Sequence, residues 1–159
     1  MNVTLICLGR LKEDYLRSAC TEYQKRLMGF CRFKIEELEA ERLPENPSEA
    51  EIAAALEKEG ERIIAKLPKA ACTVALCIEG KQQSSEELAQ LMSKAPSEGV
   101  SNMVFIIGSS YGLSDKVKCS AQIKLSMSKM TFPHQLARVM LMEQIYRAYT
   151  IINNRHYHK

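Results

Sequence analysis

The chain has 159 residues, 46% of them apolar and 26% charged, which is the composition of a globular domain and excludes a disordered or fibrous chain. No apolar run is long enough to cross a membrane, and residues 1–9 are too short for a signal peptide. We therefore expect one cytosolic domain, residues 1–159, with its own hydrophobic core.

Repeated apolar runs and helix-start signals predict an alternation of strands and helices. In chain order these are strand 3–8, helix 12–27, strand 31–36, helix 48–67, strand 73–78, helix 84–92, strand 103–107, helix 114–119, strand 123–127 and helix 133–149. Capping boxes mark two of the helix starts, Ser48 with Glu51 and Ser84 with Glu87. The alternation predicts an α/β fold, with a largely parallel sheet covered by helices on both faces.

The last predicted helix, residues 133–149, is apolar on most of its sides, whereas a surface helix needs only one apolar stripe. We therefore expect it to pack on its own sheet and also on a second molecule. Charged residues this sparse on an otherwise buried helix are either paired or functional. The polar residues in question are His134, Arg138, Glu143 and Arg147.

The use of cysteine and histidine argues against a metal site. The six cysteines form no C-x-x-C pair and lie mostly within apolar runs, so we expect buried, reduced thiols. The three histidines, His134, His156 and His158, all lie late in the chain and away from any group of cysteines. The sequence therefore contains no ligand set for zinc.

The net charge of +3 is unevenly distributed along the chain. From Ser114 onward there are eight Lys or Arg residues and only two acidic ones, so the preceding part is mildly acidic. A basic C-terminal third indicates a polyanionic partner near that end. The alternative is a solvated surface whose charge asymmetry has no function.

Three of the predicted strands end in small or flexible residues, within residues 76–80, 108–112 and 126–131. In open α/β sheets, ligands bind beyond the carboxyl ends of the strands, where glycine lets a ligand approach the backbone closely. We therefore expect the three segments to line one pocket, although each glycine taken alone is better explained as a turn residue. No dinucleotide or phosphate-loop fingerprint is present.

Polar residues near the C-terminus allow a functional and a structural interpretation. His134 is either catalytic or a satisfied histidine at the start of a helix. Arg138 either binds a phosphate through its planar guanidinium or pairs with Glu143 or another carboxylate. The tail, residues 153–159, is either a disordered chain end or a set of Arg, His and Tyr side chains that contacts RNA and reaches a neighbouring subunit's pocket.

Several short motifs are spread in order along the whole chain. They are Gly9, Lys58–Glu61, Gly80-Lys81, Ile107-Gly108, Gly112-Leu113, Ser126–Thr131, Pro133-His134, Arg138-Val139, Tyr146–Ala148 and Tyr157-His158. With these motifs the chain resembles the SPOUT-class methyltransferases that modify a pseudouridine in bacterial large-subunit ribosomal RNA, the H enzymes of that series. Two residues depart from the family pattern. Ser109 stands where a second glycine is usual, and would be strained if its φ were positive, and Tyr111 is bulkier than expected.

The resemblance implies an α/β fold with a deep C-terminal trefoil knot, a homodimer, and S-adenosyl-L-methionine as the cofactor, held by the knot loops. The cofactor contacts that it implies are Leu76, Gly108, Met127, Ser128, Lys129, Met130, Thr131 and Phe132. It also implies the product, N3-methylpseudouridine in the helix 69 loop of 23S rRNA, made on assembled ribosomes, with no membrane or metal involved.

Our hypothesis for the reaction assigns the target base to groups of the tail. His158 first, and Tyr157 second, would order or deprotonate the base in the partner's pocket. Arg138 would hold a phosphate or the base carbonyl, and His134 would be a supporting residue. Two other classes of protein are alternatives: a non-catalytic ribosome-binding or assembly factor on the same fold, and an α/β enzyme that uses a nucleotide, such as a phosphotransferase. The intact loop segments argue against the first, and the missing phosphate-loop lysine against the second.

Overall fold

A five-stranded parallel sheet forms the centre of the computed structural model, which describes residues 1–158; Lys159, the end of the predicted tail, lies outside the described residues. The strands are β1 (Asn2–Leu8), β2 (Arg32–Leu38), β3 (Cys72–Gln82), β4 (Asn102–Ile107) and β5 (Ile123–Ser126), in the spatial order β2-β1-β4-β3-β5. The helices are α1 (Asp14–Leu27), α2 (Glu49–Lys66), α3 (Ser85–Lys94), the 3₁₀ turn η1 (Ala95–Glu98), α4 (Asp115–Ser120) and α5 (His134–Ile152). The predicted α/β fold is confirmed.

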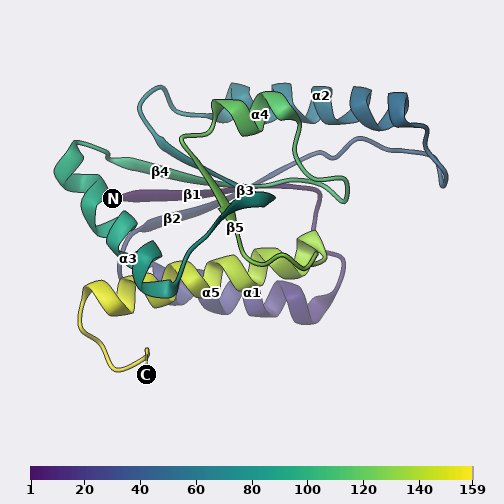
Figure 1. Ribbon diagram of the computed structural model, residues 1–159. Coiled ribbons are helices and arrows are strands. Elements are labelled where there is room, and N and C mark those ends of the chain that lie inside the picture. The colour runs from purple at the N-terminus through teal and green to yellow at the C-terminus, as the bar shows by residue number, and fades with distance from the viewer. Residues whose placement is uncertain (159) are drawn as a thin grey trace.

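Helices cover both faces of the sheet, with α2 and α4 on one face and α1, α3 and α5 on the other (Figure 1). Strand β1 shows how the sequence produces these layers, because successive side chains of a strand point to opposite faces. Val3 and Leu5 belong to the core under α1, α3 and α5, whereas Ile6 and Leu8 belong to the core under α2 and α4. All four side chains are at most 1% exposed, as expected of a central parallel strand.

Strand β3 is longer than predicted because it pairs with β5 twice, in two registers. Leu76 is paired with Leu125, and five residues later Lys81 is paired with the same Leu125. The residues between them, 77–80, form an irregular arch where the pairing with β5 shifts register. Gly80 permits this course, since a Cβ there would lie only 2.7 Å from the backbone carbonyl carbons of Lys124 and Leu125. The arch forms one wall of the site described below.

Helix α5 packs along α1 and α3 on its own sheet, as predicted. Its fully buried apolar side chains include Leu141, Met142 and Ile145. On another side of the helix, Leu136 is 39% exposed and Val139 is only partly buried. The chain therefore leaves part of the apolar surface of α5 uncovered, and the predicted packing on a second molecule stays a prediction.

Candidate cofactor-binding cleft

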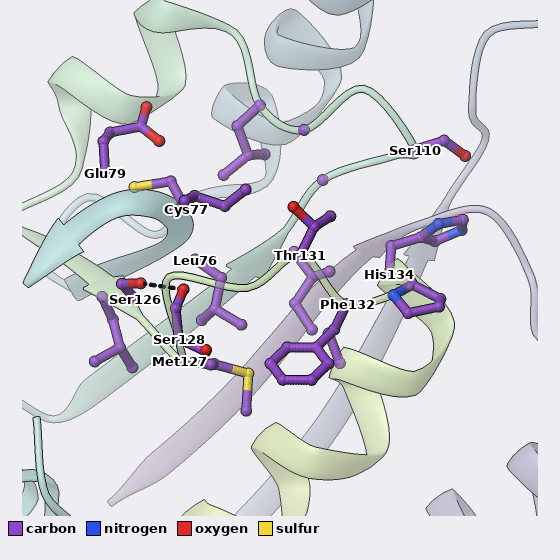
Figure 2. A pocket seen from close by; sticks show the side chains of 18 of the residues that line it. Leu76, Cys77, Glu79, Ser110, Ser126, Met127, Ser128, Thr131, Phe132 and His134 are labelled. Atoms are coloured by element: carbon purple, nitrogen blue, oxygen red, sulfur yellow. Dashed lines mark hydrogen bonds between the residues drawn. The ribbon is translucent and has the colours of Figure 1, made fainter. Parts of the chain in front are cut away.

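A cleft of about 790 Å³ lies beyond the carboxyl ends of β3, β4 and β5 (Figure 2). This volume is within the usual range for sites that hold a small molecule or cofactor. The three segments that the sequence singled out all contribute to it, together with the start of α5. The lining residues are Leu76, Cys77, Ile78, Glu79, Ile107, Gly108, Ser109, Ser110, Tyr111, Gly112, Leu113, Lys118, Leu125, Ser126, Met127, Ser128, Met130, Thr131, Phe132, Pro133, His134 and Ala137.

The loop after β4 forms the second wall of the cleft and turns back sharply on itself. The N–H of Gly112 donates to the carbonyl oxygen of Ser109 at 2.9 Å, and Gly112 has a φ of +86°. A side chain on Gly108 would clash with the carbonyl oxygen of Gly112, so only glycine fits there. Ser109, by contrast, has no positive φ. The backbone strain that this departure from the family pattern would have implied is absent.

The loop after β5 forms the third wall and is shaped by its own hydroxyl groups. The Ser126 hydroxyl donates to the carbonyl oxygen of Ser128 at 2.9 Å, and the Ser128 hydroxyl accepts from the N–H of Met130 at 3.0 Å. These bonds replace regular secondary structure between β5 and α5. In Figure 2 the side chains of Thr131 and Phe132 lie beside His134, where the loop enters α5.

Charged groups at the cleft are neutralised or held neutral. Glu79 and Lys118 pair at 2.7 Å, and the hydrogen bond from Lys118 lowers the pKa of the Glu79 carboxyl. Burial, followed by the positive charges of Arg138 and Lys12, holds the pKa of His134 below its usual value. His134 is therefore a neutral imidazole at pH 7, and adds no positive charge to repel a cationic ligand.

Seven of the eight residues predicted to contact the cofactor line this cleft, and Lys129 is the one that does not. The lining also includes Lys118, which comes from α4. Nothing in the sequence around Lys118 indicates that it lines the cleft, because α4 reaches the cleft only through its packing on the sheet. Cys77, Ile78 and Glu79 belong to the predicted segment 76–80 but were not singled out as contacts.

Arg138 lies outside the cleft and is 1% exposed. Its Nη1 donates to Oε1 of Glu37 on β2 at 2.5 Å, and its Nη2 donates to the carbonyl oxygen of Gly9 at 2.9 Å. The geometry corresponds to the structural alternative, a pair with a carboxylate elsewhere in the fold. Glu143, the other partner considered, pairs with Arg147.

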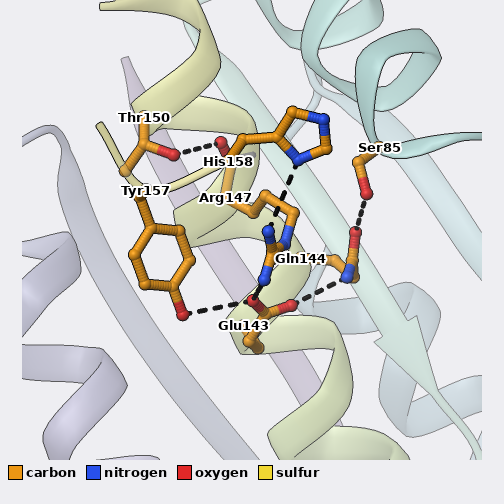
Figure 3. Close-up of polar contacts among 7 residues, drawn as sticks. All are labelled: Ser85, Glu143, Gln144, Arg147, Thr150, Tyr157 and His158. Carbon is orange, nitrogen blue, oxygen red and sulfur yellow. Dashed lines mark hydrogen bonds and ion pairs between the residues drawn. The ribbon is translucent and has the colours of Figure 1, made fainter. Parts of the chain in front are cut away.

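The tail is docked on the far end of α5 (Figure 3). The Tyr157 hydroxyl donates to Oε1 of Glu143 at 3.3 Å, and the guanidinium carbon of Arg147 lies 4.8 Å from the centre of the Tyr157 ring. Nε2 of His158 is 2.7 Å from Oε1 of Glu86 on α3, and its Nδ1 is 3.4 Å from Nη1 of Arg147. Because arginine can only donate, this Nδ1 is the accepting nitrogen of the ring.

The predicted catalytic residues of the tail are thus not brought to the chain's own cleft. The helical rise from Ala137, the last α5 residue in the cleft, to Arg147 beneath the tail is about 15 Å. Burial, with hydrogen bonds to Tyr23 and Glu143, raises the pKa of Tyr157 to about 12. Within one chain, Tyr157 is therefore a hydrogen-bond donor.

Within residues 1–158 no three His, Cys, Asp or Glu side chains are grouped as a metal ion requires. No helix in the same part of the chain has the length and apolar character needed to cross a membrane.

Fold and cleft together define the class: an α/β protein with a cofactor-sized site at the carboxyl ends of a parallel sheet. Residues 1–158 match the family described as "Predicted SPOUT methyltransferase". The chain belongs to the SPOUT methyltransferase family and, by its full-length relatives, to the branch whose members carry the name ribosomal RNA large subunit methyltransferase H. As a methyltransferase it requires a methyl donor.

Those relatives match the chain from end to end. The chain is 50% identical to "Ribosomal RNA large subunit methyltransferase H" from Clostridium novyi and 48% identical to the protein of that name from Bacillus pumilus, with 100% of each protein covered in both cases. A solved structure, the tRNA (m1G37) methyltransferase from Aquifex aeolicus, superposes with a TM-score of 0.55 at 11% identity, covering 92% of this chain and 70% of that one. At that identity the likeness shows the fold alone.

Proposed function

We propose that the chain uses S-adenosyl-L-methionine to methylate N3 of a pseudouridine in the helix 69 loop of 23S rRNA, on assembled ribosomes in the cytoplasm. The observation that carries the proposal is the convergence of the three strand-end segments into one cleft of cofactor size. The names of the full-length relatives support ribosomal RNA of the large subunit as the substrate. The match over residues 1–158 supports a single SPOUT domain, and membership of the family supports the trefoil knot.

The cleft fits the proposed cofactor in both shape and charge. Gly80 and Gly108 allow the shapes of two walls of the cleft, because a side chain at either position would clash with the chain's own backbone. The neutral His134 adds no positive charge that would repel a cationic ligand. We assign the cofactor contacts to Leu76, Gly108 and the loop after β5, namely Met127, Ser128, Lys129, Met130, Thr131 and Phe132. When bound, S-adenosyl-L-methionine supplies a methyl group on an activated sulfonium, so the residues of the chain mainly align donor and acceptor.

A homodimer is proposed because the two halves of the site lie at opposite ends of α5. The cleft takes in Ala137 at one end, whereas His158 and Tyr157 are docked near Arg147 at the other. A second copy packed on the exposed side of α5 would bring its own tail to this cleft, and the partly exposed Leu136 supports such packing.

We assign the handling of the target base to the partner's tail. His158 is the first choice, because histidine is the side chain that most often serves as a general acid or base. Tyr157, whose pKa is raised to about 12, serves better as a hydrogen-bond donor that orders the base. Arg138 is committed to Glu37 in this chain, so we assign it to supporting the start of α5, together with His134.

The test is methyl transfer from tritiated S-adenosyl-L-methionine to ribosomes purified from cells that lack this protein. We expect label in 23S rRNA, mapped to N3 of one pseudouridine in the helix 69 loop. Label at another nucleoside, or none with the full chain, would overturn the proposal. Truncation after Asn154 should abolish transfer while leaving calorimetric binding of the cofactor intact. A full rate without the tail would remove its assigned role.

The same calorimetry separates the proposal from a non-catalytic ribosome-binding factor. Such a factor would bind ribosomes without any heat of binding for S-adenosyl-L-methionine.

A further inference from the structure

Helix α2 carries a buried carboxylate that points at a wall of the cleft. Glu59 is 3% exposed, and it does not line the cleft. One oxygen, Oε1, accepts the N–H of Glu41 at 2.9 Å, and the other, Oε2, accepts the hydroxyl of Ser109 at 2.8 Å. Both partners are neutral groups, so burial of this acid is compensated by hydrogen bonds alone.

The two bonds join segments that are otherwise loops. Glu41 lies between β2 and α2, whereas Ser109 follows β4 and lines the cleft. The Ser109 hydroxyl is the donor in its bond to Glu59, so its orientation is fixed. The loop after β4 is thereby tied near its start to helix α2.

The same helix also fixes the other end of that loop. A Cβ on Gly60 would clash with the Ser114 hydroxyl, which caps α4 by accepting from the N–H of Val117 at 3.3 Å. Gly60 therefore lets the start of α4 rest directly on α2. Adjacent residues of α2, Glu59 and Gly60, hold the two ends of the loop 109–114.

We propose that Glu59 is a positioning residue for the cofactor, acting through Ser109 to hold the loop after β4 in its binding conformation. The inference rests on the proposed function, because that function makes the cleft a cofactor site. It assigns a task to the Lys58–Glu61 motif, which lies outside the cleft. The proposed effect on cofactor binding passes through the hydrogen bond between Glu59 and Ser109, so variants of these two residues test it directly.

The experiment is a double-mutant cycle of Glu59→Gln and Ser109→Ala, read by calorimetric titration of the purified full chain with S-adenosyl-L-methionine. Ser109→Ala removes the hydrogen bond, and Glu59→Gln weakens it by replacing its carboxyl acceptor with an amide. Each single variant should therefore raise the Kd by about three- to tenfold. Because both changes act on the same bond, the double variant should bind no worse than the weaker-binding single variant. In methyl transfer, the KM for the cofactor should rise by a similar factor while kcat changes less than about twofold.

The matched control is Glu57→Gln, which removes an exposed link between α2 and α4, the pair of Glu57 with Lys116 at 3.2 Å. It should leave the Kd unchanged. A Kd for Glu59→Gln equal to that of the control, or single effects that multiply in the double variant, would overturn the inference. If Glu59→Gln fails to fold, Ser109→Ala alone decides, since an unchanged Kd in that folded variant contradicts the proposal. If the unaltered chain gives no heat of binding, the proposed function fails, and this inference with it.

Discussion

Arg138 of α5 and Glu37 of β2 form an ion pair in which the arginine side chain is 1% exposed and the glutamate side chain 38%. The second terminal nitrogen of Arg138 also holds the carbonyl oxygen of Gly9, at the end of β1. The pair therefore ties the start of the last helix to two strands of the sheet. The start of that helix is also where His134 and Ala137 line the cleft, so this tie and the cleft are neighbours.

Replacing Arg138 by alanine should lower the free energy of unfolding by about 2–3 kcal/mol, because a buried side chain is removed and the Gly9 carbonyl loses its hydrogen-bond partner. The measurement is urea unfolding at pH 7. Lys34→Ala is the control, since it breaks a pair whose lysine is 66% exposed and should cost at most about 1 kcal/mol. Equal stability of the two variants would contradict the internal role of Arg138.

Gly60→Ala should destabilise the fold by about 1–3 kcal/mol, because the added methyl group would push the capping hydroxyl of Ser114 away from α2. The weakened cap of α4 adds to the cost. Thermal unfolding measures the effect. Gly29→Ala serves as the comparison, since the nearest atom to its new Cβ would be at an ordinary 3.5 Å. A loss of stability no larger than that of Gly29→Ala would show that α2 and α4 are able to move apart freely.

The folded chain should lose stability between about pH 7 and pH 5 in part through His134. Its pKa is lowered in the folded state, whereas in the unfolded chain it returns to about 6.5, so the unfolded state binds the proton more readily in this range. The contribution is complete above about pH 6.5 and is lost as the pH falls below it. His134→Gln should therefore show a smaller decline of unfolding free energy than the unaltered chain. Identical slopes for His134→Gln and the unaltered chain would contradict the assignment.

His158→Ala should reduce kcat for methyl transfer by about 100-fold or more, the usual effect of losing a general acid or base. Tyr157→Phe should cost less than about tenfold, because a phenol with a pKa of about 12 stays protonated and contributes only a hydrogen bond. Single-turnover transfer to ribosomes measures both variants, with His156→Ala as the control. A larger loss from Tyr157→Phe than from His158→Ala would reverse the two roles.

The sequence predicted the five strands and the helices between them because their apolar periodicity and capping residues are local signals. Ser48 with Glu51 and Ser84 with Glu87 form the capping boxes that the spacing indicated. The order of the strands in the sheet was not predictable, since alternation alone does not determine which strands become neighbours. The second pairing of β3 with β5 depends on Gly80, whose role appears only when the backbone of β5 lies against it.

The site was predictable to the extent that it is built from strand ends. The three segments converge because the carboxyl ends of parallel strands share one edge of the sheet. Side chains with long-range partners were not predictable. Arg138 and Glu37 are 101 positions apart in the chain, and no periodic pattern connects them. Glu59 likewise meets Ser109 across 50 positions, and no local pattern connects the Lys58–Glu61 motif with the loop after β4.

The separation of cleft and tail along α5 has a genetic consequence. If each cleft is served by the other copy's tail, a chain truncated after Asn154 keeps a sound cleft, and a chain with Gly108→Ala keeps a sound tail. Neither mutant would methylate ribosomes by itself, but a mixed pair would contain one complete site out of two. Co-expression of the two defective genes should therefore restore methylation in cells that lack the unaltered gene. This would be intragenic complementation, in which each mutant chain supplies the part of the site that the other has lost.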